Sequence, residues 1–209
     1  MESKPVQPET MYAISKFDQE RTVLSVAREM GIHGVALRLF LTYGPRQSLR
    51  NPYTGVCSIF ASQWVNGVMP RIFEDGHQSR DFVYVGDVVN AFLLVYEKPK
   101  ANGSVYNVGT GKPTEILRVA AMIGKLLGKS ADPAVEGAFR LGDVRHIVAD
   151  ISRISDLGFK ATVDLQEGIR RYLSWVESQG KIKDYFSQVY ASLMQDKVIR
   201  KVYAGKACP

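Results

Sequence analysis

Apolar residues follow two alternating patterns along the chain, one typical of helices and one typical of strands. Between Tyr12 and Met30 they recur every three or four residues and Gly31 follows, which predicts a helix that ends there. The next segment, 34–40, is short and apolar and predicts a buried strand. A helix, a tight turn and a buried strand make half of a βαβ unit, so the pattern predicts an α/β fold with a parallel sheet.

The rest of the chain continues this alternation. A loop rich in turn-forming residues spans 43–55, and a loop behind a strand of such a sheet is a common place for ligands. The further elements expected are a helix at 56–65, strands at 71–73, 81–84 and 104–108, helices from Asp87 and at 114–127, a mostly irregular stretch at 129–150, a helix that a capping box of Asp164 and Glu167 opens, and a last helix in the basic tail.

Composition narrows the class of protein. The 209 residues, 45% hydrophobic and 23% charged, suit a soluble globular domain with a sizeable core. No apolar run is long enough to span a bilayer, so no membrane partner is expected, and the first eight residues lack the apolar core of a signal peptide. Cys57 and Cys208 fit no metal or redox spacing and the three histidines are scattered, which favours a reduced, cytoplasmic protein without a metal site.

Positive charge is concentrated at the end of the chain. Residues 180–209 carry a net charge of +4, which leaves about +2 on the other 179 residues. Such a tail could contact nucleic acid or acidic lipid, or it could be a solvated helical extension. It has no recognition motif and no dense basic run, so we favour the extension and expect no nucleic-acid partner.

Tyr12 and Lys16 are the first candidates for chemistry. Their spacing puts the phenol and the ammonium on one helical face, one turn apart. An ammonium there stabilises a phenolate, which suits proton transfer to or from a sugar hydroxyl. The spacing is common in helices, however, and taken alone it favours an ordinary pair of surface residues.

The ordered set of motifs resembles the extended short-chain dehydrogenase/reductase family, in particular its nucleotide-sugar 4-epimerases of the UDP-glucose 4-epimerase kind. The resemblance covers about residues 5–178, and the matching segments are YAISK at 12–16, LRLF at 37–40, YGPRQ at 43–47, NPYTGV at 51–56, IFEDG at 72–76, RDFVYV at 80–85, YNVG at 106–109, RLGD at 140–143 and AD at 149–150. It implies the C-terminal part of an incomplete Rossmann-type parallel sheet plus a smaller mixed α/β substrate-binding subdomain. We expect these to be intermixed over 1–180, followed by the basic extension at 181–209.

The resemblance also implies a reaction, NAD-dependent epimerisation at C4 of a UDP- or dTDP-hexose by transient hydride transfer. Tyr12 would be the acid/base and Lys16 would hold the nicotinamide ribose, so that Tyr12, Lys16 and Phe40 bind the cofactor. The alternative is a catalytically inactive fragment or a nucleotide-sugar-binding module, because the glycine-rich turn and acidic residue of a dinucleotide fold do not occur in this sequence. We therefore expect a missing N-terminal NAD-binding half of roughly 120 residues, at ~30 residues for each of four βα units.

Substrate contacts follow from the same resemblance. The residues implied are Arg80 and Arg140 at the phosphates, Asp143 near the ribose, and Ile72 and Phe73 beside the base. From the residues alone, Arg80 and Asp81 could instead form a surface ion pair, Arg140 could be a solvated loop residue and Phe73 could be core. Leu41 stands where the family usually has an asparagine that meets the phosphates, and a leucine cannot donate that hydrogen bond.

Two short features complete the expectations. Gly109-Thr110-Gly111 lacks the later glycine of a phosphate loop and is expected to be a turn that leads into a helix. An open sheet edge and an apolar helix face would be exposed where the missing half belongs, so we expect a homodimer through the Tyr12–Met30 helix or a partner that supplies that half. The nucleotide sugar is the expected small-molecule partner.

Overall fold

The computed structural model describes residues 1–51, 55–129, 132–140 and 143–201, without the side chains of Arg140 and Lys201. Its helices are α1 (Met11–Glu29), α2 (Val56–Val65), α3 (Val85–Glu97), η1 (Pro99–Ala101), α4 (Ile116–Leu126), α5 (Ser152–Ser155), α6 (Leu165–Ser178) and α7 (Tyr185–Gln195). Its strands are β1 (Ala36–Leu39), β2 (Leu41–Tyr43), β3 (Arg71–Ile72), β4 (Ser79–Arg80), β5 (Phe82–Tyr84), β6 (Val105–Val108), β7 (Thr114–Glu115), β8 (Ala134–Val135), β9 (Ala138–Arg140), β10 (His146–Ile147) and β11 (Ile199–Lys201).

The chain forms two compact units, and each is built from three separate segments. The first unit consists of Met1–Thr42, Asp81–Lys112 and Val148–Val163. The second consists of Tyr43–Arg80, Pro113–Ile147 and Asp164–Pro209. Residues 181–201 belong to the second unit together with α6. The separate C-terminal extension that we expected to begin at residue 181 therefore stays a prediction.

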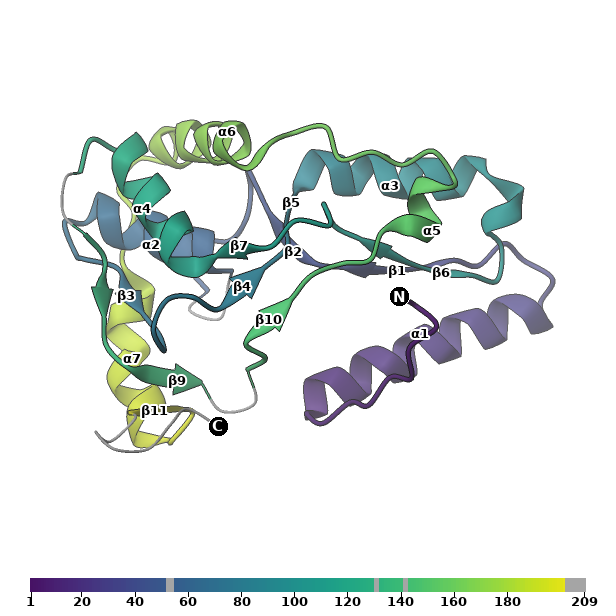
Figure 1. Cartoon of the computed structure of the whole chain (residues 1–209), viewed down its shortest axis with the longest axis horizontal. Coiled ribbons are helices and arrows are strands. Elements are labelled where there is room, and N and C mark those ends of the chain that lie inside the picture. The colour runs from purple at the N-terminus through teal and green to yellow at the C-terminus, as the bar shows by residue number, and fades with distance from the viewer. Residues whose placement is uncertain (52–54, 130–131, 141–142, 202–209) are drawn as a thin grey trace. The chain divides into compact units, whose positions relative to one another are not determined.

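A parallel sheet with helices on both faces forms the first unit. β1 pairs with β6 in parallel, from Ala36 opposite Val105 to Leu39 opposite Val108. Figure 1 shows α3 and α5 over one face of this sheet and α1 along the other. The predicted α/β architecture with a parallel sheet is therefore confirmed.

The core of the first unit lies between the sheet and the helices α3 and α5. Leu37 of β1 packs against a buried cluster whose members are Val83, Val88, Ala91, Val95, Ala101, Tyr106, Val108, Ile154, Leu157 and Phe159. Arg38, the next residue, instead forms two hydrogen bonds of 2.7 and 2.8 Å with Glu20 of α1. Because side chains alternate across a strand, Leu37 and Arg38 face opposite sides of the sheet, and the strand is half-buried, whereas the sequence predicted a buried one.

Helix α1 begins and ends close to where the sequence predicts, and it exposes apolar side chains, as expected for a chain without the missing half. The Thr10 hydroxyl accepts a hydrogen bond of 3.1 Å from the N–H of Ala13. Gly31 follows the helix with a φ of +66°, a conformation that glycine adopts without strain. Only Ala27 is buried, and the large apolar or aromatic side chains exposed on the helix are Met11, Tyr12, Ile14, Val23 and Val26.

Helices α2, α4 and α6 pack together in the second unit. The Trp64 indole N–H donates a 3.1 Å hydrogen bond to the carbonyl of Ala120, and Gly124 leaves room for the ring, which a Cβ there would approach to 2.9 Å. At the start of α6 the Asp164 carboxylate accepts from the N–H of Glu167 at 2.9 Å, as predicted. The Glu167 side chain pairs with arginines one turn on, so only half of the predicted capping box forms.

Three short strands interrupt the described part of the stretch 129–150, which the sequence predicts to be mostly irregular. In that stretch β8 pairs with β3 in parallel, β10 pairs with β4 in parallel and β9 pairs with β11 antiparallel. On its other side β4 pairs antiparallel with β7. Strands of two or three residues carry too weak an alternation to be seen in the sequence.

The basic tail contributes structure to the second unit. Its described part contains α7, as the expected helix, and then β11, which the sequence did not predict. Phe186, Leu193 and Ile199 are buried together with Ala138. In addition, the Tyr190 hydroxyl donates a 2.9 Å hydrogen bond to Glu136. Burial and this carboxylate raise the pKa of Tyr190. The tail is therefore attached through a packed face.

Two buried aspartates join separate segments of the first unit. Asp81 accepts hydrogen bonds from the N–H groups of Thr110, Gly111 and Ala149 and from the Thr110 hydroxyl, at 2.6–3.2 Å. Asp87 accepts from the N–H and hydroxyl of Thr162 and from the N–H of Val163, at 2.8–3.2 Å. Each carboxylate is 1% exposed, and these donors replace the water that it loses.

Asp81→Asn tests this arrangement. An amide NH₂ would replace one acceptor oxygen and face N–H donors, so we expect the free energy of unfolding to fall by about 2–4 kcal/mol. Urea denaturation followed by circular dichroism measures the change. Asp18→Asn, on the exposed surface of α1, is the matched control. Equal midpoints for the two variants would contradict the structural role of Asp81.

Gly168→Ala tests the packing of α6. A Cβ on Gly168 would lie 2.1 Å from the hydroxyl oxygen of the buried Tyr43, so we expect a loss of about 1–3 kcal/mol in the free energy of unfolding. Tyr43→Phe removes that oxygen but leaves the ring carbon at 2.8 Å. Part of the loss should therefore be recovered in the double variant, and a double-mutant cycle of denaturation midpoints measures the coupling. Strict additivity would show that the two positions do not clash.

Candidate functional site

Tyr12 and Lys16 lie one turn apart on a single face of α1. The Lys16 ammonium is 5.9 Å from the centroid of the Tyr12 ring and donates a 3.1 Å hydrogen bond to Gln19. The Tyr12 side chain is 71% exposed, so its hydroxyl is open to a ligand. The neighbouring Ser15 hydroxyl donates to the backbone carbonyl of Tyr12 and not to its phenol. The structure thus supplies the geometry that the sequence predicted for this pair.

Both residues line a cleft of about 570 Å³ between α1 and β1. The apolar part of its wall includes Phe17 and Val23 of the helix and Leu37 and Leu39 of the strand. Phe40, the third residue expected to bind the cofactor, follows β1 and is half-buried; its N–H donates to the carbonyl of Val108. A cleft with a phenol and an ammonium over an apolar floor can hold a ring that carries hydroxyl groups.

Two N–H groups of the Gly109-Thr110-Gly111 turn are already used within the fold and are not available to a phosphate. The N–H groups of Thr110 and Gly111 donate to Asp81, as described above. A Cβ on Gly109 would lie 2.6 Å from an Asp81 oxygen, so glycine is needed there to let the carboxylate approach. The prediction that this is not a phosphate loop is consistent with these contacts.

Arg80 belongs to β4 in the second unit and has three hydrogen-bond acceptors. Its guanidinium donates to the carbonyls of Ser79 and Arg145 at 2.9 and 3.0 Å and to Asp143 at 2.7 Å. The structure therefore brings together Arg80 and Asp143, two of the residues expected to bind substrate. Since Asp81 is buried with other partners, the alternative of a surface ion pair between Arg80 and Asp81 is wrong.

Arg145, which the sequence analysis did not select, forms a second charged cluster in this region. It pairs with Glu74 and with Asp75, each at 2.6 Å. The hydrogen bond from Arg145 holds the pKa of Asp75 below its usual range. The sequence signal for this cluster is the Glu74-Asp75-Gly76 turn, because two adjacent carboxylates are stabilised by a nearby cation. His146 is exposed, and its ring nitrogen lies 2.9 Å from the Ser79 hydroxyl oxygen.

Ile72 and Phe73 differ in their availability to a ligand. The Ile72 side chain is fully buried, so it contributes packing rather than a ligand contact. Phe73 is half-buried, and its ring centroid is 6.3 Å from that of Phe186 in the core of the second unit. The alternative that Phe73 is a core residue is thus supported, and a contact between Phe73 and a base stays a prediction.

Some expected site residues lie outside the described part of the chain. These are the side chain of Arg140, Leu141 and Gly142 of the RLGD motif, and 52–54 of the NPYTGV motif. Leu41, in place of the expected asparagine, is half-buried in β2, and its N–H donates to the carbonyl of Asp81.

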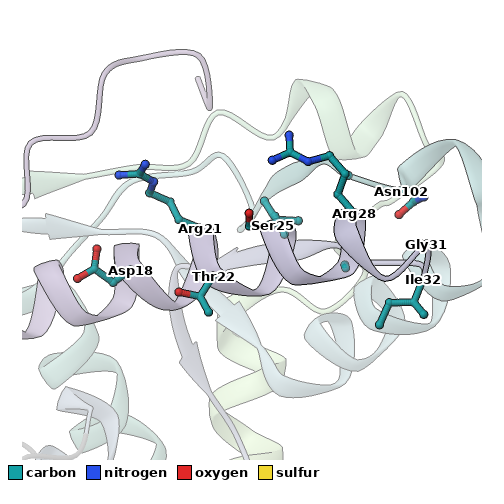
Figure 2. Close-up of a pocket in the computed structure, with 11 residues that line it drawn as sticks. Asp18, Arg21, Thr22, Ser25, Arg28, Gly31, Ile32 and Asn102 are labelled. Atoms are coloured by element: carbon teal, nitrogen blue, oxygen red, sulfur yellow. The ribbon is translucent and has the colours of Figure 1, made fainter.

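Three further observations concern ligands, nucleophiles and metal ions. A second cleft on α1, of about 950 Å³, is lined by Asp18, Arg21, Ser25 and Arg28, and Figure 2 shows the two arginines projecting from the same side of the helix. Burial raises the pKa of the Cys57 thiol to about 12, so that it stays protonated and is a poor nucleophile. The described residues contain no group of acidic, His or Cys side chains placed to hold a metal ion, and none of their helices is long and apolar enough to cross a membrane.

Known proteins match this arrangement over most of the chain. The family model described as NAD dependent epimerase/dehydratase family matches residues 1–109. A dTDP-L-rhamnose 4-epimerase of Burkholderia thailandensis is 33% identical over 174 residues, which are 83% of this chain and 48% of that protein.

Solved structures agree with the sequence matches. A UDP-N-acetylglucosamine 4-epimerase of Methanobrevibacter ruminantium M1, in complex with UDP-N-acetylmuramic acid, is 37% identical with a TM-score of 0.79, over 86% of this chain and 57% of that one. A UDP-glucose 4-epimerase of Thermotoga maritima with UDP-glucose is 33% identical with a TM-score of 0.78, over the same shares.

The chain spans about half of the length of these relatives. The resemblance that the ordered motifs suggested is confirmed by all three comparisons. Because the family model covers more than half of the 209 residues, the chain belongs to the NAD-dependent epimerase/dehydratase family.

Proposed function

We propose that this chain carries the acid/base pair and the nucleotide-sugar-binding residues of an NAD-dependent nucleotide-sugar 4-epimerase. The observation that carries the proposal is the exposed Tyr12 phenol with the Lys16 ammonium 5.9 Å from its ring, above a cleft of about 570 Å³. The substrate is a UDP- or dTDP-hexose, in keeping with the names of the related epimerases. The sugar itself is not specified by these residues.

The Tyr12 hydroxyl oxygen is the proton carrier in this proposal. It accepts the proton of the sugar C4 hydroxyl and later returns it, and the positive charge of Lys16 favours the phenolate that this exchange requires. Lys16 has three N–H donors, of which one is used by Gln19, so it can also hold a ribose hydroxyl. NAD, when bound, supplies the acceptor for the C4 hydride.

The residues present fit one end of NAD. Tyr12 and Lys16 offer a hydroxyl and an ammonium in the cleft beside β1, which suits a nicotinamide ribose, and Phe40 follows that strand directly, although it is not among the residues that line the cleft. The pyrophosphate needs a glycine-rich turn with free N–H groups, and the Gly109–Gly111 turn is unsuited because Asp81 accepts from the N–H groups of Thr110 and Gly111. We therefore propose that full cofactor binding requires residues that the longer relatives have in addition.

Arg80 is the proposed phosphate contact of the second unit. A guanidinium binds a diphosphate through paired hydrogen bonds, and Arg80 is already oriented by two backbone carbonyls. The substrate would replace Asp143, whose carboxylate occupies the remaining face of Arg80 and is 45% exposed. Once released from Arg80, Asp143 is free to accept a hydrogen bond from a ribose hydroxyl.

The exposed faces of the first unit support a proposal about partners. β1 pairs with β6 on one side, and α1 exposes Met11, Ile14 and Val26. We propose that a strand-forming segment of the kind the longer relatives carry completes the sheet, in the same polypeptide or in another. A homodimer through α1 would cover the exposed apolar side chains of that helix.

A nucleotide-sugar-binding module without catalysis is the second candidate. The second unit has its own packed core and holds the Arg80 site, whereas the Tyr12 cleft belongs to the first unit. Leu41 in place of the expected asparagine also removes one phosphate contact. Binding without turnover in the experiments below would favour this candidate.

Tyr12→Phe tests the catalytic proposal. The chain is fused to, or mixed with, the N-terminal part of a relative such as the Thermotoga maritima UDP-glucose 4-epimerase, and interconversion of UDP-glucose and UDP-galactose is followed with added NAD. Loss of the proton carrier should lower kcat by at least about 10²-fold. Tyr96→Phe, at an 84% exposed tyrosine of α3, is the control and should leave kcat unchanged. If the complemented chain with intact Tyr12 converts no UDP- or dTDP-hexose, the catalytic proposal fails.

Arg80→Lys and Arg80→Ala test the binding proposal. Calorimetry with UDP should show at least about tenfold weaker affinity for both, because neither side chain forms the paired hydrogen bonds of a guanidinium. Arg118→Ala, at an exposed arginine of α4, removes the same charge elsewhere in the second unit and should keep the affinity. Unchanged UDP affinity in Arg80→Ala would count against this site.

A further inference from the structure

A basic cleft of about 620 Å³ lies in the second unit. Arg46 and Arg50 line it from the segment after β2, and Lys181 and Lys183 line it from the segment between α6 and α7. These residues are more than 130 positions apart in the sequence, so only the fold gathers them. Its volume lies in the range of about 300–1,000 Å³ that is usual for small-ligand sites.

Positive charge in the cleft is not compensated. All four side chains are exposed, and among the described residues none of them has an ion-pair or hydrogen-bond partner. No described carboxylate lines the cleft. The neighbouring Asp184 is buried, and it accepts a 3.0 Å hydrogen bond from the N–H of Ser187 as the cap of α7. Four cations around one cleft repel each other, so their electrostatic interaction energy is unfavourable. An anion bound between them makes the electrostatic energy favourable.

The wall of the cleft also contains two aromatic side chains. Trp175 of α6 and Tyr185 of α7 line it and are both half-buried. Trp175 is held in place by Tyr172, whose ring stacks on it with centroids 5.8 Å apart and an interplanar angle of 28°. Held aromatic faces beside cations favour a ligand that combines a planar ring with negative charge.

We propose that this basic cleft binds a nucleoside polyphosphate, with the phosphates between the four cations and the base against the aromatic wall. Several phosphates match the charge of four cations better than a single carboxylate does. Arg80, Asp143 and Phe73 do not line the cleft, so it is a different set of residues from the proposed sugar-nucleotide site. The first residues of the basic tail, Lys181 and Lys183, would thus bind the ligand together with Arg46 and Arg50.

Calorimetry on the full chain with ATP and with inorganic tripolyphosphate, at low salt, tests this proposal. We expect one saturable site for each probe. Lys181→Gln/Lys183→Gln should weaken both by at least about tenfold, because hydrogen bonds to charged groups are lost. Arg46→Gln/Arg50→Gln, on the other wall, should do the same. Lys125→Gln/Lys129→Gln removes two exposed lysines near the end of α4 and should change neither affinity by more than about twofold.

Two further variants identify the ligand class and the site. Tyr185→Ala should weaken ATP while leaving tripolyphosphate unchanged, since only ATP carries a ring. Arg80→Ala should keep the ATP affinity, which separates this cleft from the sugar-nucleotide site. Circular dichroism of each variant serves as the control for folding. The proposal is overturned if the α4 variant weakens binding as much as the cleft variants do, if no saturable site is found, or if duplex DNA binds more tightly than ATP with the same dependence on the four cations.

Discussion

Two buried carboxylates, Asp81 and Asp87, are the constraint on which the first unit depends. A carboxylate that is 1% exposed has lost its water, and leaving it without donors would cost several kcal/mol. Both find donors on the segment 148–163, at Ala149 and at Thr162 and Val163, and Asp81 also accepts from the Gly109–Gly111 turn of its own segment. The segments 81–112 and 148–163 are therefore held together by hydrogen bonds of fixed geometry as well as by the apolar core between them.

The same constraint decides what the glycine-rich turn can do. The N–H groups of Thr110 and Gly111 could bind an anionic ligand, but they already donate to the Asp81 carboxylate of the same chain. The N–H groups of Thr110 and Gly111 are therefore used within the fold, and the proposed chemistry of the first unit depends on residues of α1. There the exposed Tyr12 and Lys16 stand above their cleft without a covering element among the described residues.

Charge has a different role in the second unit. Around Arg80 and Arg145 every guanidinium is matched by carboxylates or carbonyls, which orders the loops near β4 and β10. In the basic cleft the four cations are unmatched among the described residues. Matched cations stabilise the fold, whereas unmatched ones, gathered around a hollow, are suited to a ligand that arrives from solution.

The sequence by itself determined the class of the fold, the ends of the main helices and the Tyr12–Lys16 pair, because these depend on local spacing: helical periodicity, Gly31 after the first helix, Asp164 as a cap, and a four-residue step. It did not reveal the strands β8 to β11 or the partners of Arg80. Those depend on residues far apart in the chain: Arg80 meets Asp143, β9 meets β11, and Arg46 shares a cleft with Lys183. Only the tertiary structure decided them, since a side chain's burial and partners are set by which distant segments the fold brings beside it.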